Sequence, residues 1–342
     1  MTLTLFLRVY DLFFRTNCAI VPPKEVLYMI DFKRLKLSRK EDYEKILFAC
    51  PGRSCEYSFA NMYLWGRQEG AFFPDCVGFF SHFNGKSIYP YPVGTGDRRA
   101  VLETVIQDAH ERGIPCRISS MTKAEAEELE AWFPGKFLIR TDRDGFDYVY
   151  AIHDLADLKG RKFQKKRNHV NRFRAEHPEA VCVPLEPGNL DMARDMVKDW
   201  YRQRLAEDPH GEYLLERIAM DRAFRHFQAL GMEGLMLLDG DRVLAMTMAS
   251  RLSRNTMDVH FEKAREDVDG AYAAINCEFA RYLREKHPEL EYLNREDDMG
   301  LEGLRKAKLS YQPHHFEEKY WACLMEDLHG DVCAEDTVDN VL

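Results

Sequence analysis

A run that is apolar on both faces, VLAMTMAS at 243–250, constrains the fold of this chain more than any other feature. A strand without a polar face has to be covered on both sides, which is typical of a central strand in a sheet layered with helices. Two turn sequences flank the run, DG at 239–240 and RN at 254–255. They predict hairpins that pair it with strands at 234–238 and 256–262.

The segment that follows predicts a pair of parallel strands. Apolar residues recur at helical spacing through 271–285, so this segment is predicted to be a helix with one apolar face, and a strand is predicted at 289–294. A helix of this length is the usual crossover between neighbouring parallel strands. Strands 256–262 and 289–294 should therefore run side by side, in an α/β fold with mixed sheets layered by helices.

The rest of the chain shows the same alternation, and its length suits two domains rather than one. We place the first domain at 29–150 and the second at 151–325, followed by an acidic tail at 326–342. The further helices are predicted at 40–68, 97–113, 122–133, 160–176, 189–204 and 212–230, and the further strands at 71–91 (two, around the turn 84–85), 115–119 and 146–151.

Residues 1–28 are treated as an N-terminal extension. Arg8, Asp11 and Arg15 interrupt its apolar stretch, whereas a signal peptide needs an unbroken apolar core after its positive charge. Two interpretations remain, a loosely attached helix or a translation start at Met29. We favour the second and expect the extension to pack poorly and to carry no function.

Composition excludes several classes of protein. The nine cysteines are scattered and form no CxxC pair, which indicates reduced thiols in a cytoplasmic protein and neither a disulfide frame nor a zinc site. A net charge of −9 argues against indiscriminate nucleic-acid binding, and no apolar stretch is long enough to span a membrane. Because nucleotide-binding glycine motifs and HExxH are also absent from the sequence, we expect no metal and no bound cofactor.

A basic helix is predicted at 160–176, and the sequence KGRKFQKKRNHVNRFR at 159–174 contains no acid. Its apolar residues Phe163, Val170 and Phe173 can dock the helix and leave the charges outside. Such a surface suits phosphate groups, although a merely solvated helix face is about equally compatible with the pattern. The candidate RNA- or phosphate-binding residues are Lys162, Lys165, Lys166, Arg167 and Arg172.

Acidic residues mark the candidate catalytic site. Alternation along 256–262 puts Asp258, His260 and Glu262 on one face, either lining a cleft or facing solvent. The sequence NREDD at 294–298 follows the next strand, where α/β sheets bind ligands, although one aspartate there could simply cap a helix. We expect the two groups to meet, with Glu262 as the ammonium ligand or general base, His260 as the second candidate and Asp297 beside them.

The remaining candidates are substrate-binding residues around this cleft. Asp258 and the loop residues Asn294, Arg295 and Glu296 would line it, and either Arg295 or Arg305 would face a phosphate or a developing oxyanion. Further along, Arg305, Lys308 and Tyr311 would provide a second phosphate or carboxylate contact. The alternative for these last basic residues is charge that complements the C-terminus of a helix.

Several fragments in order resemble one bacterial family: CEYSFANMYLW (55–65), YPYPVG (89–94), DYVY (147–150), KKRNHVNRF (165–173), HFEKA (260–264), GAYAAIN (270–276), NREDDMG (294–300), LRKAKLSY (304–311) and KY (319–320). The family is that of proteins like the C-terminal domain of phosphatidylglycerol lysyltransferases. The resemblance covers roughly residues 29–322. It implies two tandem GNAT-like (N-acetyltransferase-like) domains, as in Fem-type aminoacyltransferases, with HFEK and NREDD forming walls of one cleft.

Three functions follow from the residues and the resemblance. The first is an aminoacyltransferase that takes an amino acid from aminoacyl-tRNA and passes it to a lipid headgroup or an amine, in the cytoplasm or at the membrane periphery. The second is an acyl-CoA-dependent N-acyltransferase, which the sequence AREDVDGAY before helix 271–285 disfavours because it lacks a glycine-rich pyrophosphate loop. The third is a non-catalytic module that binds RNA or another ligand.

Overall fold

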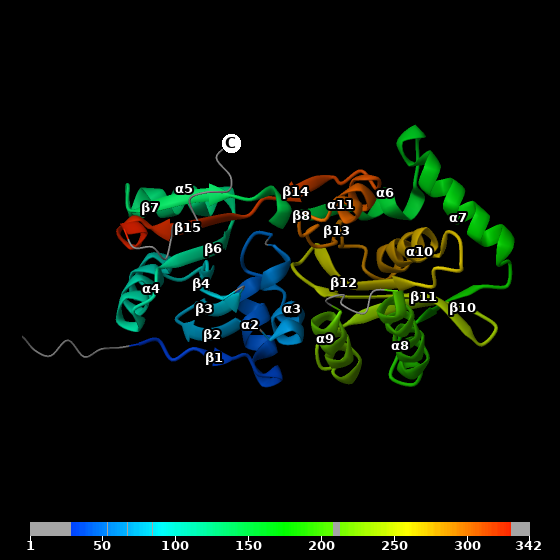
Figure 1. Cartoon of the computed structure of the whole chain (residues 1–342), viewed down its shortest axis with the longest axis horizontal. Coiled ribbons are helices and arrows are strands. Elements are labelled where there is room, and N and C mark those ends of the chain that lie inside the picture. The colour runs from blue at the N-terminus through cyan, green and yellow to red at the C-terminus, as the bar shows by residue number, and fades with distance from the viewer. Residues whose placement is uncertain (1–28, 53, 67, 84, 208–212, 330–342) are drawn as a thin grey trace, which may run out of the picture.

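The computed structural model describes residues 29–329 except 53, 67, 84 and 208–212, and consists of two mixed sheets, each covered by helices (Figure 1). The predictions for residues 1–28 and for most of the acidic tail lie outside the described residues. No helix of the described part is long and apolar enough to cross a bilayer.

The first part of the chain forms most of the first sheet and its helices. Its elements are β1 (Lys33–Arg34), α2 (Lys40–Leu47), α3 (Phe59–Trp65), β2 (Gln68–Phe73), β3 (Cys76–Phe83), β4 (Lys86–Pro90), β5 (Val93–Gly94), α4 (Arg98–Arg112), β6 (Arg117–Met121), α5 (Lys123–Trp132) and β7 (Phe137–Thr141).

Two predictions for this part were wrong in detail. The helix predicted at 40–68 is two helices: α2 ends at Leu47, before Pro51-Gly52, and α3 starts anew where Ser58 caps the backbone N–H of Asn61. The segment predicted as two strands at 71–91 belongs to three, β2, β3 and β4, of which β2 starts earlier. The helices near 97–113 and 122–133 and the strand near 115–119 are confirmed.

The second part contains β8 (Asp147–Ala151), α6 (Ile152–Asp157), α7 (Gln164–Glu176), β9 (Val181–Pro184), α8 (Leu190–Glu207), α9 (Leu214–Arg225), β10 (Glu233–Asp239), β11 (Arg242–Arg251), β12 (Thr256–Ala264), α10 (Ala271–Lys286), β13 (Tyr292–Asn294), α11 (Glu302–Leu309), β14 (His315–Glu317) and β15 (Tyr320–Leu324). The central position of β11 is confirmed, since all of its residues except the two terminal ones are buried. The parallel pairing of β12 with β13 is confirmed as well.

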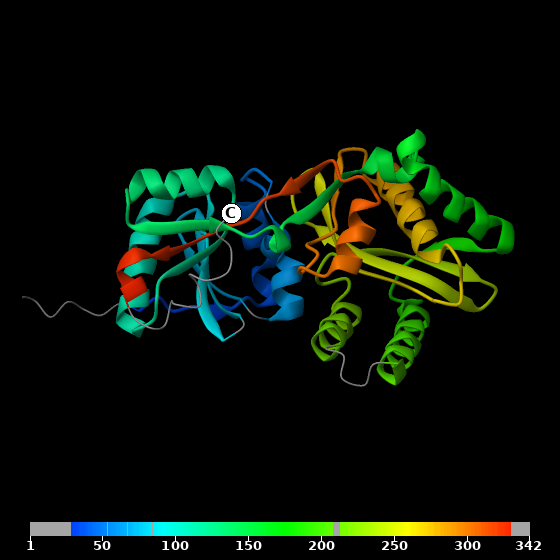
Figure 2. The same ribbon diagram turned by 45° about the horizontal axis from the view of Figure 1, so that its top comes forward.

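The two sheets exchange strands, which shifts the domain boundaries from the predicted ones. The second sheet has the order β14-β8-β13-β12-β11-β10-β9, so it includes β8, which precedes the boundary predicted at 150. In return β15 inserts between β6 and β7 of the first sheet. Figure 2 shows this last strand, in red, running back from the second sheet to the first. Local sequence patterns carry no signal for such an exchange, because a strand has the same pattern whichever sheet it joins.

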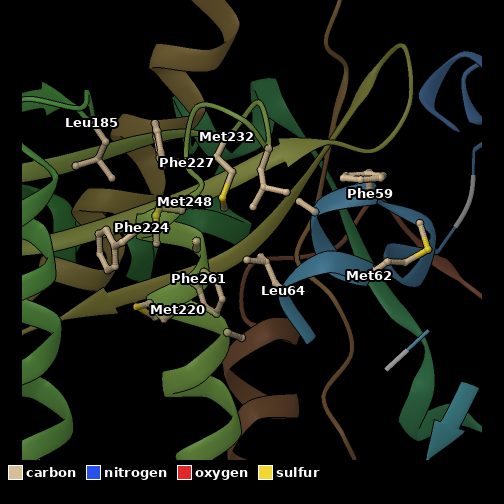
Figure 3. Close-up of a cluster of buried hydrophobic side chains, with 14 of the residues drawn as sticks. Phe59, Met62, Leu64, Leu185, Met220, Phe224, Phe227, Met232, Met248 and Phe261 are labelled. Atoms are coloured by element: carbon tan, nitrogen blue, oxygen red, sulfur yellow. The ribbon is translucent and has the colours of Figure 1, made fainter. Parts of the chain in front are cut away.

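A shared hydrophobic core joins the two sheets. Phe59 and Leu64 of α3 belong to the same buried cluster as Phe224 of α9 and Phe261 of β12 (Figure 3). The α8/α9 face of the second sheet is thus closed partly by the first domain, while α10 covers the opposite face with a cluster of its own. Residues at this junction come from both halves of the chain and pack in one buried cluster.

Candidate functional site

A β-bulge in β12 determines which way the predicted site residues point. Met248 of β11 pairs with Phe261, but its neighbour Ala249 pairs with Val259, so His260 is an extra residue on its strand. An extra residue reverses the alternation of side chains beyond it. Val259 accordingly packs in the cluster on the α10 face, whereas Phe261 packs in the cluster with α8 and α9.

The prediction that Asp258, His260 and Glu262 share one face is therefore wrong. His260 Nε2 lies 2.8 Å from Ser250 Oγ and its Nδ1 lies 3.4 Å from Asp258 Oδ2, on the side of the shared core. Glu262 points to the other face, where its Oε2 accepts a hydrogen bond of 3.3 Å from Asn276 of α10. The bulge creates two separate polar sites on the two faces of one strand.

The first site lies where β12 and β13 diverge. The two strands pair only as far as Asp258 and Asn294, and beyond this point Arg295 Nη2 donates to Glu262 Oε1 over 2.9 Å. Both side chains are largely buried, with 13% and 11% of their surface exposed. Arg295 Nη1 and Asn276 Oδ1 are buried without a hydrogen-bond partner among the described residues. The site thus offers one free donor and one free acceptor beside a carboxylate.

The basic helix α7 reaches this site through Lys166. Its ammonium group stands 3.7 Å from the centre of the Tyr311 ring, and the guanidinium of Arg295 stands 4.9 Å from the same ring. Burial, followed by the neighbouring Arg295 charge, lowers the pKa of Lys166 to about 8. An appreciable fraction of this amine is therefore neutral near physiological pH, as a general base requires. We refer to Glu262, Arg295, Asn276, Lys166 and Tyr311 as the fork site.

The second site is an acidic cluster between the two sheets. His260 Nδ1 lies 3.4 Å from Asp258 Oδ2 and 3.4 Å from Glu296 Oε1, and Asn61 of α3 donates to Glu296 Oε1 over 3.1 Å. The Asp258 side chain is completely buried, and neither of its oxygens has a hydrogen bond of normal geometry to a described residue. Burial, then Glu296 and Asp147, raises the pKa of Asp258 well above its usual range. We call Asp258, His260 and Glu296 the junction cluster.

Lys319 partly compensates the acids next to this cluster. Its Nζ lies 2.6 Å from both Glu56 Oε1 and Asp147 Oδ1 and 3.7 Å from Asp297 Oδ2. Burial opposes the charge on Lys319, but Asp147 and the other acids outweigh it and hold the pKa well above its usual range. The carboxylate of Asp147 also accepts hydrogen bonds from Cys55 N and from Asn294 Nδ2. Asn294 and Asp297 are thus placed at the junction.

Sequence reasoning missed several residues here: Cys55, Glu56, Asn61 and Asp147. They come from the first half of the chain or from the exchanged strand β8, which the predicted boundary assigned to another domain. Each lies in a fragment that resembles the family, and that resemblance was the available signal.

Two residues predicted to bind substrate instead hold the loop after β13. Arg305 donates to both oxygens of the buried Asp298, at 2.8 and 2.9 Å, and also contacts Asp144. Lys308 Nζ donates to the backbone carbonyls of residues 295, 296 and 297. Because these N–H groups already donate to Asp298, Asp144 and the loop carbonyls, the two side chains position Arg295 and Glu296. They do not offer a free contact for a phosphate.

The basic helix docks as predicted, but its charges are not equally available. Phe163, Val170 and Phe173 are buried, which confirms the apolar stripe. Arg167, which is half-buried, holds the preceding turn through the carbonyls of residues 158 and 160. The exposed Lys162 pairs with Asp154, and the exposed Arg172 pairs with Asp269. Among the described residues no acid pairs with Lys165, which is exposed. The outer face of α7 therefore keeps a smaller set of accessible bases than the sequence suggested.

Comparison with known proteins agrees with this architecture. A crystal structure of a conserved protein of unknown function from Bacteroides thetaiotaomicron is 37% identical, with a TM-score of 0.82 over 86% of this chain and 100% of that one. L-PGS from Bacillus licheniformis shares the fold, at 13% identity and a TM-score of 0.60 over 83% of this chain and 91% of that one. An uncharacterised protein of Mycoplasmoides gallisepticum is 25% identical over 200 residues, a match that spans 56% of this chain and 61% of that protein.

The family profile "Phosphatidylglycerol lysyltransferase, C-terminal" matches residues 50–323, so it includes the fork site, the junction cluster and the basic helix. The expected α/β fold with mixed sheets layered by helices is confirmed, and L-PGS shares it. By its sequence and its fold, the chain belongs to the phosphatidylglycerol lysyltransferase C-terminal family.

Proposed function

We propose that this chain is an aminoacyltransferase that moves an amino acid from an aminoacyl-tRNA ester to an amine or hydroxyl acceptor. The observation that supports it best is the fork site, where a buried carboxylate, an arginine with a free N–H group and a lysine of lowered pKa meet beneath a basic helix. A tRNA ester is already activated, so the reaction needs orientation and charge stabilisation rather than a covalent nucleophile.

Three residues of the fork site, Glu262, Lys166 and Arg295, take part in the proposed reaction. Glu262 holds the α-ammonium group of the amino acid, and neutral Lys166 accepts the proton of the attacking acceptor. The acceptor attacks the ester carbonyl, Arg295 Nη1 donates to the oxyanion, and the carbon–oxygen bond to the ribose then breaks. Lys166 finally returns its proton to the ribose hydroxyl, so no proton is gained or lost by the enzyme.

The outer face of α7 would hold the acceptor end of the tRNA. Lys165 and Arg172 are exposed on it, and Lys166 from the same helix reaches the fork site. One helix therefore connects a phosphate-binding surface with the proposed reaction centre. The proposal keeps the expected cytoplasmic or membrane-peripheral setting, with a lipid headgroup or a small amine as the acceptor.

The acyl-CoA alternative is disfavoured by the packing at the N-terminus of α10. In an acetyltransferase the first turn of this helix would face the pyrophosphate. Here α7 covers it so closely that a Cβ on Gly270, which caps α10 with φ +80°, would lie 2.4 Å from the carbonyl oxygen of His169. The space beside Gly270 is filled by protein backbone.

The test is transfer of labelled amino acids from a charged bacterial tRNA pool to extracted lipids and amines, followed by mass spectrometry. We expect Glu262→Gln to lower kcat/KM at least about thirtyfold, because loss of one partner of a buried charge pair costs about 2 kcal/mol or more. The exposed Glu302→Gln should have no effect. Equal activity of Glu262→Gln and the parent would refute the assignment.

RNA binding is tested separately with uncharged tRNA. Lys165→Glu with Arg172→Glu should weaken binding and reduce the slope of log K against log salt by about 0.7–0.9 for each phosphate that the protein no longer neutralises. The matched control, Lys198→Glu on α8, should bind as the parent does. Binding of the parent that does not depend on salt would contradict the proposal.

A further inference from the structure

We propose that the junction cluster, Asp258, His260 and Glu296, binds a divalent transition-metal ion between the two domains. The cluster lies on the opposite face of β12 from Glu262, so the inference does not depend on the proposed transfer reaction. It departs from the expectation, drawn from the absence of sequence motifs, that the protein has no metal site.

The candidate ligand atoms of the three side chains are spaced as the ligands of a single metal ion would be. The candidate ligand atoms of Asp258, His260 and Glu296 all lie within 4.8 Å of one another. His260 Nδ1 is 3.4 Å from an oxygen of each carboxylate. Two ligands that each lie about 2.1 Å from one ion are separated by roughly 3–4 Å, so an ion fits here with small side-chain movements.

The buried groups of the cluster are poorly satisfied: the side chain of Ser58 lies near Asp258 and lowers its pKa, but the opposing effects of burial and of the neighbouring acids outweigh it. Neither oxygen of Asp258 nor Nδ1 of His260 makes a hydrogen bond of normal geometry to a described residue, and both side chains have no exposed surface. A direct imidazolium–carboxylate hydrogen bond would be about 2.7–2.9 Å long, and the separations of 3.4 Å are clearly longer. A buried carboxylate left in this state is costly, and a cation between the three groups would remove that cost.

Neighbouring groups orient two of the three ligands. Ser250 Oγ lies 2.8 Å from His260 Nε2, and Asn61 donates to Glu296 Oε1 over 3.1 Å. When Nε2–H donates to Ser250, the lone pair of the ring is on Nδ1, which points to the carboxylates. Metal-bound histidines are usually fixed by such a hydrogen bond from their second nitrogen.

Charge at the junction also favours a cation. Asp258 and Glu296 lie next to Asp147, Glu56 and Asp297, whereas Lys319 and Lys308 are the ammonium groups that contact these acids or their loop. Five carboxyl groups thus stand against two ammonium groups among these residues. Glu296 keeps 24% of its side chain exposed, which gives an ion a route in from solvent.

A second set of possible metal ligands lies nearby but is not an alternative metal site. Cys55, Glu56 and Asp147 also come close enough to share an ion, but Lys319 Nζ already lies 2.6 Å from both of these carboxylates. The ammonium group occupies the place that a metal would take. No such group stands between Asp258, His260 and Glu296 in the part of the chain that the structure describes.

The donor set indicates the kind of ion. One imidazole and two carboxylates suit Mn²⁺, Fe²⁺ or Zn²⁺, whereas Ca²⁺ and Mg²⁺ prefer oxygen ligands alone. Three protein ligands leave positions open for water or for a ligand that enters beside Glu296. Because Asn61 of α3 supports Glu296, a bound ion would also tie the first domain to the second.

The experiment uses the full-length protein after treatment with EDTA and titrates it with Mn²⁺, which binds thiolates poorly and so avoids the cysteines. Isothermal titration and the electron paramagnetic resonance signal of free Mn²⁺ should show one site. Binding should also raise Tm through linkage. Asp258→Asn and Glu296→Gln should each weaken binding at least about tenfold, while Glu262→Gln on the other face should bind as the parent does.

Three results would overturn the inference. The first is no binding of Mn²⁺ at a hundredfold excess over protein. The second is binding that persists unchanged in Asp258→Asn and Glu296→Gln. The third is a rise in Tm with lysine amide and none with Mn²⁺. The last would identify an ammonium group as the ligand of the cluster. Circular dichroism verifies that each variant folds, and the partly exposed Glu296 provides a variant that leaves the buried strand intact. Metal binding is measured without RNA, so its failure is distinguishable from failure of the transfer assay.

Discussion

Replacement of Lys166 by methionine tests the electrostatics of the fork site. Methionine has nearly the same shape without the charge. Because burial and Arg295 lower the pKa of Lys166 from its ordinary 10.5 to about 8, charging this amine costs free energy in the folded protein. The sign follows from proton binding. Between pH 8 and 10.5 the unfolded chain holds more protons, so the lysine-containing protein gains stability as the pH rises through this window.

The magnitude combines two opposing contributions. A pKa lowered from 10.5 to about 8 corresponds to a penalty of about 3 kcal/mol at pH 7. The ammonium group also lies 3.7 Å from the Tyr311 ring centre, and a desolvated cation–π contact of this kind contributes about 1–2 kcal/mol. We therefore expect Lys166→Met to stabilise the protein by about 2 kcal/mol at pH 7, and the gain to shrink steadily above pH 8.

Urea unfolding of both proteins at pH 7, 8 and 9.5 measures this gain, with far-ultraviolet circular dichroism as the probe. The neighbouring exposed Lys165→Met is the matched control and should change stability by less than about 0.5 kcal/mol at each pH. A loss of more than about 1 kcal/mol in Lys166→Met at pH 7 would show that the charged amine stabilises the fold, and would refute the argument. The stabilised variant should at the same time lose transferase activity, since it lacks the proposed base.

Three further substitutions test the surroundings of the two sites. Phe163→Ala should cost about 3–5 kcal/mol in urea unfolding, because the ring is fully buried under the basic helix. Asp298→Asn should cost about 1.5–3 kcal/mol, because the buried carboxylate loses its charge-assisted hydrogen bonds to Arg305. Arg305 lowers the pKa of this carboxylate, so its contribution should be lost as the pH falls below about 4. Gly270→Ala should cost at least about 2 kcal/mol and should change the proteolysis pattern of α7, because the new methyl group meets the carbonyl of His169.

The sequence by itself determined most elements and one essential neighbour relation. The double-sided apolar run predicted β11 as a central strand, and the length of helix 271–285 predicted that β12 and β13 pair in parallel. This pairing brings Glu262 close to Arg295 and His260 close to Glu296, as was expected of the two polar groups. Periodicity and connection length are local properties, and for this reason they can be read from one sequence.

Only the tertiary structure determined how the polar residues divide between two sites. The bulge at His260 turns Glu262 to the opposite face from Asp258, and strict alternation cannot reveal where one residue is inserted. Strand exchange brings Asp147 and Lys319 together at the junction, although 172 positions of sequence numbering separate Asp147 from Lys319. The free energy of these arrangements depends on long-range packing and on charges brought together by folding, and neither is encoded in any short segment of the chain.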